Sequence, residues 1–310
     1  MIVLLTGCDS PTNDNQDLAM SDLPLPMETM LAPAQTLTTC LAVDASGVYW
    51  TDQGGGANKL LKAPLGGGAP VTLAVGADAP GCVAIDSTNA YFTSGDQLMQ
   101  APLSGTAGAQ PIAGGQHFLG QRPLYAQGGY VWWITDVYGA VDAFNGSNAI
   151  VRVRSGSAVE VMFDGVIGNP GGLAVDDANY YYSDTNGVFI QPRAGGSGLS
   201  VGTSSVHNNT FAIDSAHLAI VEIASIGTGD VAVLRLDGMA RVIASPMLAA
   251  ALALDETGVY ARQGNHLMRF ALDGTKTLTL AEAGPRAIAL DAANIYFTDG
   301  ASIQKIAKPQ

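Results

Sequence analysis

Charged residues are scarce in this chain. They make up 13% of its 310 residues, against about a quarter in an ordinary soluble domain. Basic residues number 14, none of them before Lys59, and the formal net charge is −13. Nucleic acids and anionic membrane surfaces are bound by clusters of basic residues, so the composition argues against both as partners.

Long apolar runs and catalytic motifs are also missing. The longest apolar run, Ile243 to Leu254, is interrupted by Ser245 and Pro246 and is shorter than the roughly 20 residues that span a bilayer. The sequence has no HExxH motif, no GxSxG nucleophile elbow and no phosphate-binding glycine loop. Its four histidines lie far apart, at His117, His207, His217 and His266. We therefore expect no metal and no cofactor, and assign no catalytic residue.

What the chain has in quantity is glycine, with 38 residues, and a short motif that recurs along its length. The motif is an apolar pentad that ends in an acid, with glutamine in one copy. Its last residues are Asp44, Asp86, Gln127, Asp176, Asp214, Asp255 and Asp291. Successive intervals are 42, 41, 49, 38, 41 and 36 residues. This periodicity indicates a repeat architecture of seven units.

Each unit has the pattern of four short strands. Alanine stands two residues before the acid in six units, between larger aliphatic residues, as expected for a strand buried on both faces. An aromatic residue follows the acid by five positions in six units, within a second strand. A glycine-containing turn such as Asp273-Gly274 then joins a third strand to a fourth. The pattern predicts an all-β, seven-bladed β-propeller of four-stranded antiparallel blades.

Closure of the ring is predicted from its ends. The last unit stops one strand short, after Ile303 to Lys308, whereas an extra strand-like segment, Gln35 to Thr39, precedes the first unit. Pairing the two would leave no free edge, so the ring is expected to close by this N-terminal strand joining the C-terminal blade.

The tetrad Tyr49-Trp50-Thr51-Asp52, with its later variants YFTS, YYSD and YFTD, carries a resemblance. Over roughly residues 35 to 310 the chain resembles the YWTD, NHL and TolB-like propeller families. That resemblance implies the blade fold and specifies no ligand. Related propellers include lyases and lactonases with a metal in the central channel, but their ligands have no matching residues in this sequence.

The repeated acids are interpreted as structural. At the end of the innermost strand, a carboxylate such as that of Asp44 can accept hydrogen bonds from the backbone N–H groups of the turn. The aromatic residue five positions later is expected to pack between blades. A second acid, first seen as Asp52, recurs in some units and is given a structural role as well.

The N-terminal residues have a different character. The tetrad Leu5-Thr6-Gly7-Cys8 resembles a bacterial lipobox, which implies lipidation of Cys8 and a multi-acyl membrane anchor. The apolar stretch before it is short for a signal peptide, so residues 1–8 are interpreted as a truncated signal, with a chance apolar tail as the alternative. Residues 9–33, rich in Asp, Asn, Ser and Pro, are interpreted as a disordered acidic tether, and residues 34–310 as the propeller.

Two cysteines occupy the same position in adjacent units. Cys40 and Cys82 each precede the acid by four residues. An exported protein could oxidise them to a disulfide, but equivalent positions around a ring point the same way, and disulfide geometry is demanding. The alternative is that both are small buried residues.

A recognition surface is predicted where the units differ. Arg122 and Arg286 stand at the same height before the inner strands of units three and seven, near His117. The third unit also carries an insertion, residues 138–150, which includes Tyr138 and Phe144. Long loops on one face of a rigid scaffold are common binding sites. We expect this loop-rich mouth to favour an anionic or carbohydrate group, unless the arginines merely cap loop carbonyls and the aromatics pack the insertion.

Two functions fit these observations. The first is a noncatalytic cell-envelope lipoprotein, periplasmic or surface-exposed, whose monomeric propeller binds or scaffolds a protein or glycan partner. The alternative is an extracytoplasmic lyase or hydrolase with a metal in the central channel.

Overall fold

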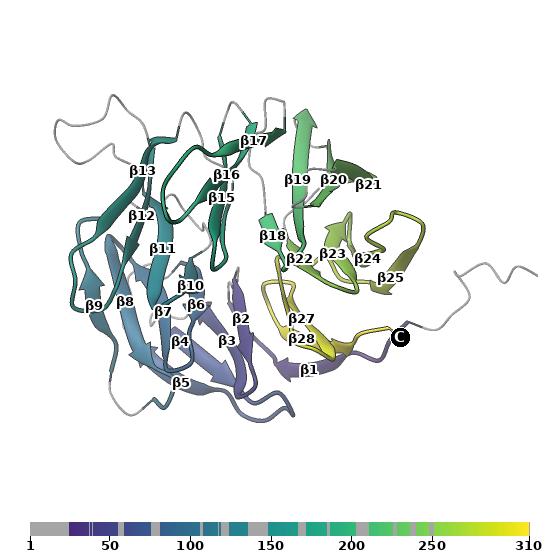
Figure 1. The fold of residues 1–310 in the computed structure, drawn as a ribbon. Coiled ribbons are helices and arrows are strands. Elements are labelled where there is room, and N and C mark those ends of the chain that lie inside the picture. Colours follow the sequence, from purple (N-terminus) through teal and green to yellow (C-terminus); the bar gives the residue numbers. More distant parts are fainter. Residues whose placement is uncertain are drawn as a thin grey trace, which may run out of the picture.

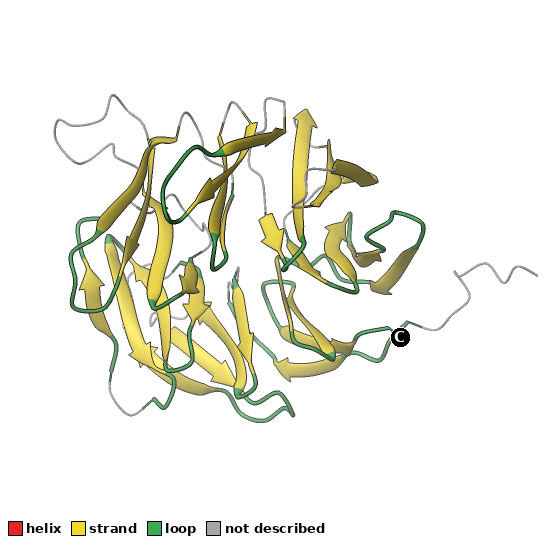
Figure 2. Cartoon of the chain, viewed as in Figure 1, coloured by secondary structure: helices red, strands yellow, loops and turns green. Residues whose placement is uncertain are grey.

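The computed structural model describes residues 25–309 apart from 37, 39, 55–58, 76–80, 106–107, 117, 119–123, 136–147, 167–171, 185–186, 203–210, 226–227, 236–239 and 248–250. All of the regular elements in the described part are β-strands (Figure 2). No described segment forms a helix long and apolar enough to cross a membrane.

The strands form four-stranded antiparallel sheets in which strands consecutive in sequence pair. Three of these sheets lie in the first half of the chain, and in each of them the hydrogen-bonded order follows the sequence order. The first is β2 (Leu41–Asp44), β3 (Gly47–Asp52), β4 (Lys59–Ala63) and β5 (Val71–Val75). The second is β6 (Val83–Ile85), β7 (Asn89–Ser94), β8 (Gln97–Pro102) and β9 (Gln110–Ala113). The third is β10 (Tyr125–Gln127), β11 (Tyr130–Thr135), β12 (Asn148–Val153) and β13 (Glu160–Val166).

The remaining sheets repeat this plan. One sheet is β14 (Leu173–Val175), β15 (Asn179–Asp184), β16 (Gly187–Pro192) and β17 (Leu199–Gly202). The next is β18 (Phe211–Ile213), β19 (His217–Ser225), β20 (Thr228–Arg235) and β21 (Ala240–Met247). Another is β22 (Leu252–Asp255), β23 (Gly258–Gln263), β24 (His266–Phe270) and β25 (Thr277–Ala281). The last is β26 (Ala287–Leu290), β27 (Asn294–Thr298), β28 (Ile303–Ala307) and β1 (Thr29–Ala32).

The sheets are arranged around a ring. The first strand of each sheet lies next to the first strand of the following sheet, and the series closes because β26 contacts β2. Figure 1 shows β2, β6, β10, β18 and β22 toward the centre, with the fourth strands, such as β5, β9 and β13, at the periphery. Each sheet therefore extends radially from the centre of the ring, and each of its two faces packs against a neighbouring sheet.

The closing strand differs from the one that the sequence predicted. An N-terminal strand does join the C-terminal sheet, but it is β1, in which Thr29 pairs with Lys305 and Ala32 with Ile303 (Figure 1). The predicted strand, Gln35 to Thr39, is wrong. Gln35 N donates to Ala301 O at 2.7 Å and Thr38 N to Gly300 O at 3.3 Å, so the described residues of this segment contact the turn between β27 and β28 instead of extending the sheet. The folded domain accordingly begins inside the stretch 9–33 that was predicted to be a tether.

Burial explains why β1 takes the closing position. Leu31 and Ala32 are 3% and 0% exposed and pack with Trp50 and Tyr296. The polar Gln-Thr-Leu-Thr-Thr segment offers a single large apolar side chain for the same place. Removal of apolar surface from water therefore favours the Met-Leu-Ala segment in the ladder.

The core lies between the sheets rather than at the centre of the ring. The residue five positions after each repeated acid is buried and faces the following sheet: Tyr49 packs on Val83 and Phe92, and Tyr260 packs on Ile295 and Phe297. The predicted packing of these positions between blades is confirmed. Each sheet is thus held to the next by an apolar layer, and the ring depends on every layer.

Candidate functional site

The repeated carboxylates occupy the turns between first and second strands. In the second sheet, Asp86 Oδ1 accepts the backbone N–H of Thr88 at 2.7 Å and that of Asn89 at 2.8 Å. The same pair of backbone hydrogen bonds, to residues two and three positions later, is made by Asp44, Asp176, Asp214 and Asp291. The predicted Asx-type cap is confirmed in these turns.

A second contact, which the sequence did not predict, engages the other carboxylate oxygen. The tyrosine five residues after the acid donates its hydroxyl to Oδ2, at 2.7 Å from Tyr91 to Asp86 and at 2.6 Å from Tyr296 to Asp291. Tyr181 donates to Asp176 in the same way at 2.6 Å. The repeated aromatic therefore has two roles, because its ring packs against the next sheet while its hydroxyl fixes the turn of its own sheet.

These contacts shift the ionisation of both partners. Burial alone raises the pKa of Asp291, but hydrogen bonds from Tyr296 and from the N–H groups of Ala293 and Asn294 outweigh it and hold that pKa below its usual value. Burial, followed by the hydrogen bond to the carboxylate, raises the pKa of Tyr296. The pair is thus fixed as a carboxylate and a neutral phenol across the neutral range.

In three sheets a residue other than tyrosine contacts the residue at the position of the repeated acid. Asp214 has Ala219 at the fifth position, and His217 instead places Nδ1 3.1 Å from both carboxylate oxygens. Asp255 is bonded by the ammonium group of Lys308, next to the C-terminus. Where glutamine replaces the acid, at Gln127, the fifth residue is Trp132, whose indole nitrogen approaches the Gln127 carbonyl at 3.4 Å.

The carboxylates are therefore not arranged for acid–base chemistry. Catalytic carboxylates have to face a common reacting centre, whereas these are distributed around the ring and bonded within their own turns. Among the described residues, no three or more His, Cys, Asp or Glu side chains lie close enough together to hold a metal ion.

Hydroxyl groups of the YWTD-like tetrads form a second repeated contact. Their third position is a buried threonine or serine: Thr51, Thr93, Ser183 and Thr298 are each at most 4% exposed. Thr51 Oγ1 donates to Gly81 O of the next sheet at 2.6 Å, and Thr93 Oγ1 accepts Gly81 N–H at 2.9 Å. The hydroxyls of Thr51 and Thr93 therefore hold the chain where it enters β6, which explains the tetrad in these two sheets as an element of the fold.

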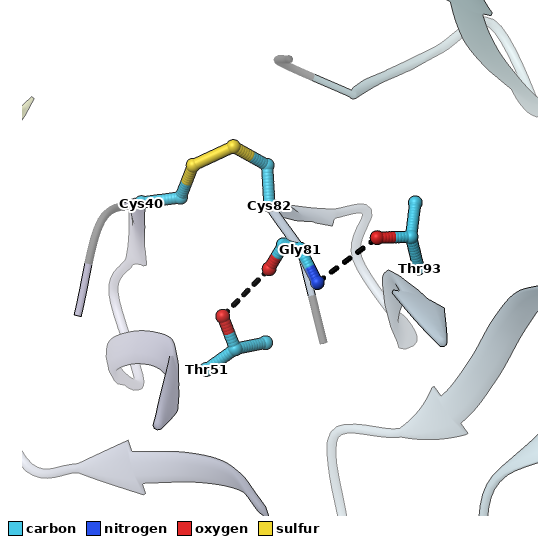
Figure 3. The surroundings of a disulfide bond; sticks show 5 residues. All are labelled: Cys40, Thr51, Gly81, Cys82 and Thr93. Carbon is cyan, nitrogen blue, oxygen red and sulfur yellow. Dashed lines mark hydrogen bonds between the residues drawn. A yellow bond between two sulfur atoms is a disulfide. The ribbon is translucent and has the colours of Figure 1, made fainter. Parts of the chain in front are cut away.

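Cys40 and Cys82 form a disulfide bond, with their Cα atoms 5.0 Å apart. Figure 3 shows the bond beside Gly81, which Thr51 and Thr93 hold. Both cysteines precede the first residue of their inner strands, β2 and β6. Of the two alternatives that the sequence left open, the structure shows the bridge.

The predicted mouth is described in part. Arg122, His117, Tyr138 and Phe144 lie outside the described residues, as does Cys8. Arg286 is exposed at the start of β26, and its backbone N–H donates to Thr298 O at 2.6 Å. Its side chain lies across Gly300, where an added Cβ would be 2.9 Å from Nε and where φ is +100°.

A second arginine, which is not one of the predicted site residues, lies near the same end of the adjacent sheet. Arg262 Nε donates to Gly264 O at 2.8 Å, and an added Cβ at Gly284 would lie 3.0 Å from Arg262 Nη2. Arg262 lies near the end of β23, and Gly284 precedes β26. The described rim of the mouth therefore carries an arginine on each of the last two sheets, together with the exposed acids Glu282 and Asp299.

The strongest grouping of charged and aromatic side chains was also missed. The guanidinium groups of Arg152 and Arg154 lie 4.1 and 4.4 Å from the centre of the Tyr130 ring, and that of Arg193 lies 5.0 Å from the centre of the Trp132 ring. In the sequence, Arg152 and Arg154 are two residues apart, as are Tyr130 and Trp132, and this spacing could have indicated the grouping. The two pairs can be placed side by side only once the register of β11 with β12 is known.

A cavity lies between the outer parts of the first two sheets. It has a volume of about 430 Å³ and is lined by β5 and by residues of β7 and β8, with Leu73, Phe92 and Met99 as apolar and Ser94 and Gln97 as polar members. It contains neither an arginine nor a histidine, and it lies outside the predicted mouth.

Comparisons with known proteins bear on the fold. No protein-family model matches the chain, and no curated protein matches its sequence. Among solved structures, an oligogalacturonate lyase in complex with manganese superimposes with a TM-score of 0.69 at 12% identity, covering 92% of this chain and 94% of the lyase. The chain has a β-propeller fold. An oligogalacturonate lyase from Vibrio parahaemolyticus gives a TM-score of 0.67 at 10% identity, covering 91% of this chain and 92% of that one.

A propeller that is not described as a lyase has a similar TM-score. The WD40 β-propeller domain of Doa1 has a TM-score of 0.63 at 12% identity, covering 92% of this chain and 97% of that one. At such identities the likeness concerns the fold, and one propeller scaffold carries many unrelated functions.

Proposed function

We propose that this β-propeller is a noncatalytic binding or scaffold module of the bacterial cell envelope, seven-bladed and monomeric, with a protein or glycan partner on its loop-rich mouth. The observation that carries the proposal is the engagement of the repeated acids. Their oxygens are bonded to turn N–H groups and to tyrosine hydroxyls, so the groups that recur around the ring build the scaffold. The described part of the mouth offers the exposed Arg286 for recognition.

Two further observations support the location. The disulfide between Cys40 and Cys82 is typical of proteins that mature outside the reducing cytoplasm. The lipobox-like tetrad Leu5 to Cys8 fits the same compartment, with lipid attached at Cys8. In this proposal the propeller faces the periplasm or the outside of the cell, anchored through lipid alone.

The blade count of seven is supported by the sheets and by the contacts of their inner strands, which run from β2 through β6, β10, β14, β18, β22 and β26 and return to β2. A ring of this kind is rigid because each apolar layer is shared by two sheets. Such a scaffold holds loop side chains in fixed positions, as a binding module requires.

The experiment is a thermal-shift panel on the purified chain. Divalent ions, acidic sugars, glycan fragments and peptides are each added in excess, since a ligand at about 100 times its Kd stabilises the folded state by about 2.7 kcal/mol. The proposal predicts a shift with a glycan or peptide that disappears in Arg122→Ala/Arg286→Ala. Lys276→Ala, which removes an exposed cation from the turn before β25, is the control and keeps the shift.

The alternative function, a metal-dependent lyase or hydrolase of the cell envelope, draws on the fold likeness to an oligogalacturonate lyase bound to manganese. It predicts a divalent ion in the purified protein by elemental analysis and a melting temperature that a chelator lowers. A metal-free domain that retains a partner would favour the binding module, and a reversible metal-dependent shift would reject it.

A further inference from the structure

Three arginines and two aromatic residues form one cluster on the third and fourth sheets. Arg152 and Arg154 lie over the Tyr130 ring, and Arg152 and Arg193 lie 5.1 and 5.0 Å from the centre of the Trp132 ring. The chain has nine arginines and a net charge of −13. A third of its arginines therefore gather around two rings, and we name these five residues the arginine cluster.

Strand register explains how the cluster assembles. Trp132 on β11 pairs with Arg152 on β12, and residues two apart on a strand share a face, so Tyr130 and Arg154 continue the same row. Arg193 comes from the neighbouring sheet, where Nη1 donates to Asp176 O at 2.7 Å. Its guanidinium lies against the turn at Gly128, where an added Cβ would be 2.8 Å from Nη2.

The cluster lies at the end of the propeller opposite to the mouth. The mouth is where the inner strands begin, as Arg286 shows by its place directly before β26. Tyr130 instead follows the turn at which the inner strand β10 ends, because β10 stops at Gln127 and β11 starts at Tyr130. A ligand bound to the cluster therefore does not compete with one at the mouth.

The arginines differ in the hydrogen-bond capacity that they retain. Stacking on an aromatic ring uses the face of a guanidinium and leaves its in-plane N–H donors available. Arg152 directs Nε and Nη2 to Glu160 Oε2, at 2.8 and 2.7 Å, and Arg193 donates to a backbone carbonyl. Arg154 is exposed, and none of the described residues accepts a hydrogen bond from its guanidinium.

From this arrangement we infer that the arginine cluster binds a carboxylate from an acidic segment of a protein partner, with Arg154 as the principal donor. The Glu160 carboxylate on Arg152 shows how such a group is received, since guanidinium forks match carboxylates in shape and charge. The inference rests on the proposed binding function, and it adds a second face and the chemistry of the partner.

A protein segment fits this surface better than a sugar. Sugars that bind aromatic residues stack on the ring face, and in the arginine cluster guanidinium groups lie over both rings. Arginine, tyrosine and tryptophan are also the residues that most often dominate binding energy at protein interfaces. Because the protein as a whole is strongly acidic, an acidic peptide has no general electrostatic attraction to it, and binding would report a local site.

The test uses the full chain and a fluorescein-labelled, glutamate-rich peptide, with binding followed by fluorescence anisotropy at moderate salt. We expect saturable binding that Arg154→Gln weakens at least tenfold. Lys276→Gln, which also removes one positive charge, at the exposed turn before β25, should leave the affinity unaltered. Tyr130→Leu should weaken binding because it removes the ring that orients two arginines, and Tyr130→Phe should retain it. Melting temperatures within about 2 °C of the parent establish that each variant is folded.

Several outcomes overturn the inference: no binding of the peptide, equal affinity of Arg154→Gln and the parent, or equal losses from Arg154→Gln and Lys276→Gln. Preferential competition by an oligomeric glucuronate, dependent on Arg154, would replace the protein partner with a glycan. None of these results bears on the mouth, because the proposed function is tested by the thermal shifts that depend on Arg122 and Arg286. The two proposals can therefore fail separately.

Discussion

The hydroxyl of Tyr296 donates to Asp291 Oδ2 at 2.6 Å, while Asp291 Oδ1 accepts the backbone N–H of Asn294 at the same distance. One carboxylate thus joins the turn between β26 and β27 to a side chain that is 0% exposed between the last sheet and the first. Turn geometry and packing between sheets are coupled through a single residue pair. The pair recurs in other sheets, so the coupling belongs to the repeat.

Removing the hydroxyl tests this coupling. Tyr296→Phe keeps the ring in its layer but leaves Asp291 Oδ2 without its phenol donor, and it should lower the free energy of unfolding by about 1 to 3 kcal/mol. Tyr180→Phe is the matched control, because Tyr180 is also buried but its hydroxyl approaches its acceptor, Met162 O, at 3.5 Å. Urea denaturation measures both, and equal small effects would contradict a role for the phenol.

Acid should destabilise the fold through the same carboxylates. Burial raises the pKa values of Asp86, Asp255 and Asp291. Hydrogen bonds lower them by more, so the pKa values lie below the ordinary value of 3.8. Their contribution to stability is complete above the unfolded pKa and is lost as the pH falls through the lower folded pKa. We expect the urea midpoint to be constant near neutrality and to fall below about pH 4. Asp291→Asn should reduce the slope of that fall.

Alkali should act through the tyrosines, with the opposite sign. Burial, and then the neighbouring carboxylate, raise the pKa values of Tyr91, Tyr181 and Tyr296 above 10.0. The folded state therefore holds these protons after the unfolded state has lost them, and stability falls as the pH rises beyond about 10. Ultraviolet titration of the phenolate provides the readout. Release of all tyrosine protons at the ordinary pKa without unfolding would refute this prediction.

Reduction of the disulfide should weaken the junction of the first two sheets. Cys40 and Cys82 are separated by 42 residues, and the chain-entropy model assigns a crosslink over such a loop about 4 kcal/mol. The Cys40→Ser/Cys82→Ser variant and the reduced parent should therefore melt at similar temperatures, both below the oxidised parent. Thiol labelling of the unreduced, denatured protein is the independent check. Two reactive thiols there would show that the bond is absent.

The sequence predicted the parts of the fold that repeat locally. The apolar pentad, its acid and the aromatic residue five positions later lie within one hairpin, so the inner strands and their turns followed from short-range pattern. The phenol–carboxylate bond was missed because the acid was assigned to the backbone and the aromatic to packing. Only the hairpin register, in which Ala289 pairs with Tyr296, shows that the phenol extends along the strand to the turn at Asp291.

Features that depend on partners distant in sequence could not be predicted in this way. β1 has four residues, of which two are buried, and its identity as the closing strand depends on its fit to β28, at the other end of the chain. The arginine cluster requires Arg193 of one sheet to reach Trp132 of another. The predicted mouth rests on Arg286 among the described residues, since its other members lie outside them. Composition and spacing carry no information about such contacts.

The closing strand offers the sharpest test of the ring. Leu31 and Met30 are neighbours on β1, but Leu31 is 3% exposed among Trp50 and Tyr296, whereas Met30 is 59% exposed. Leu31→Ala should lower the free energy of unfolding by about 2 to 4 kcal/mol because it leaves a cavity in the layer that joins the last sheet to the first. Met30→Ala, on the opposite side of the same strand, should change it by less than about 0.5 kcal/mol. If β1 were a dispensable extension, both changes would be silent. A large, single cooperative loss in Leu31→Ala alone is the result expected if β1 is part of the cooperative ring.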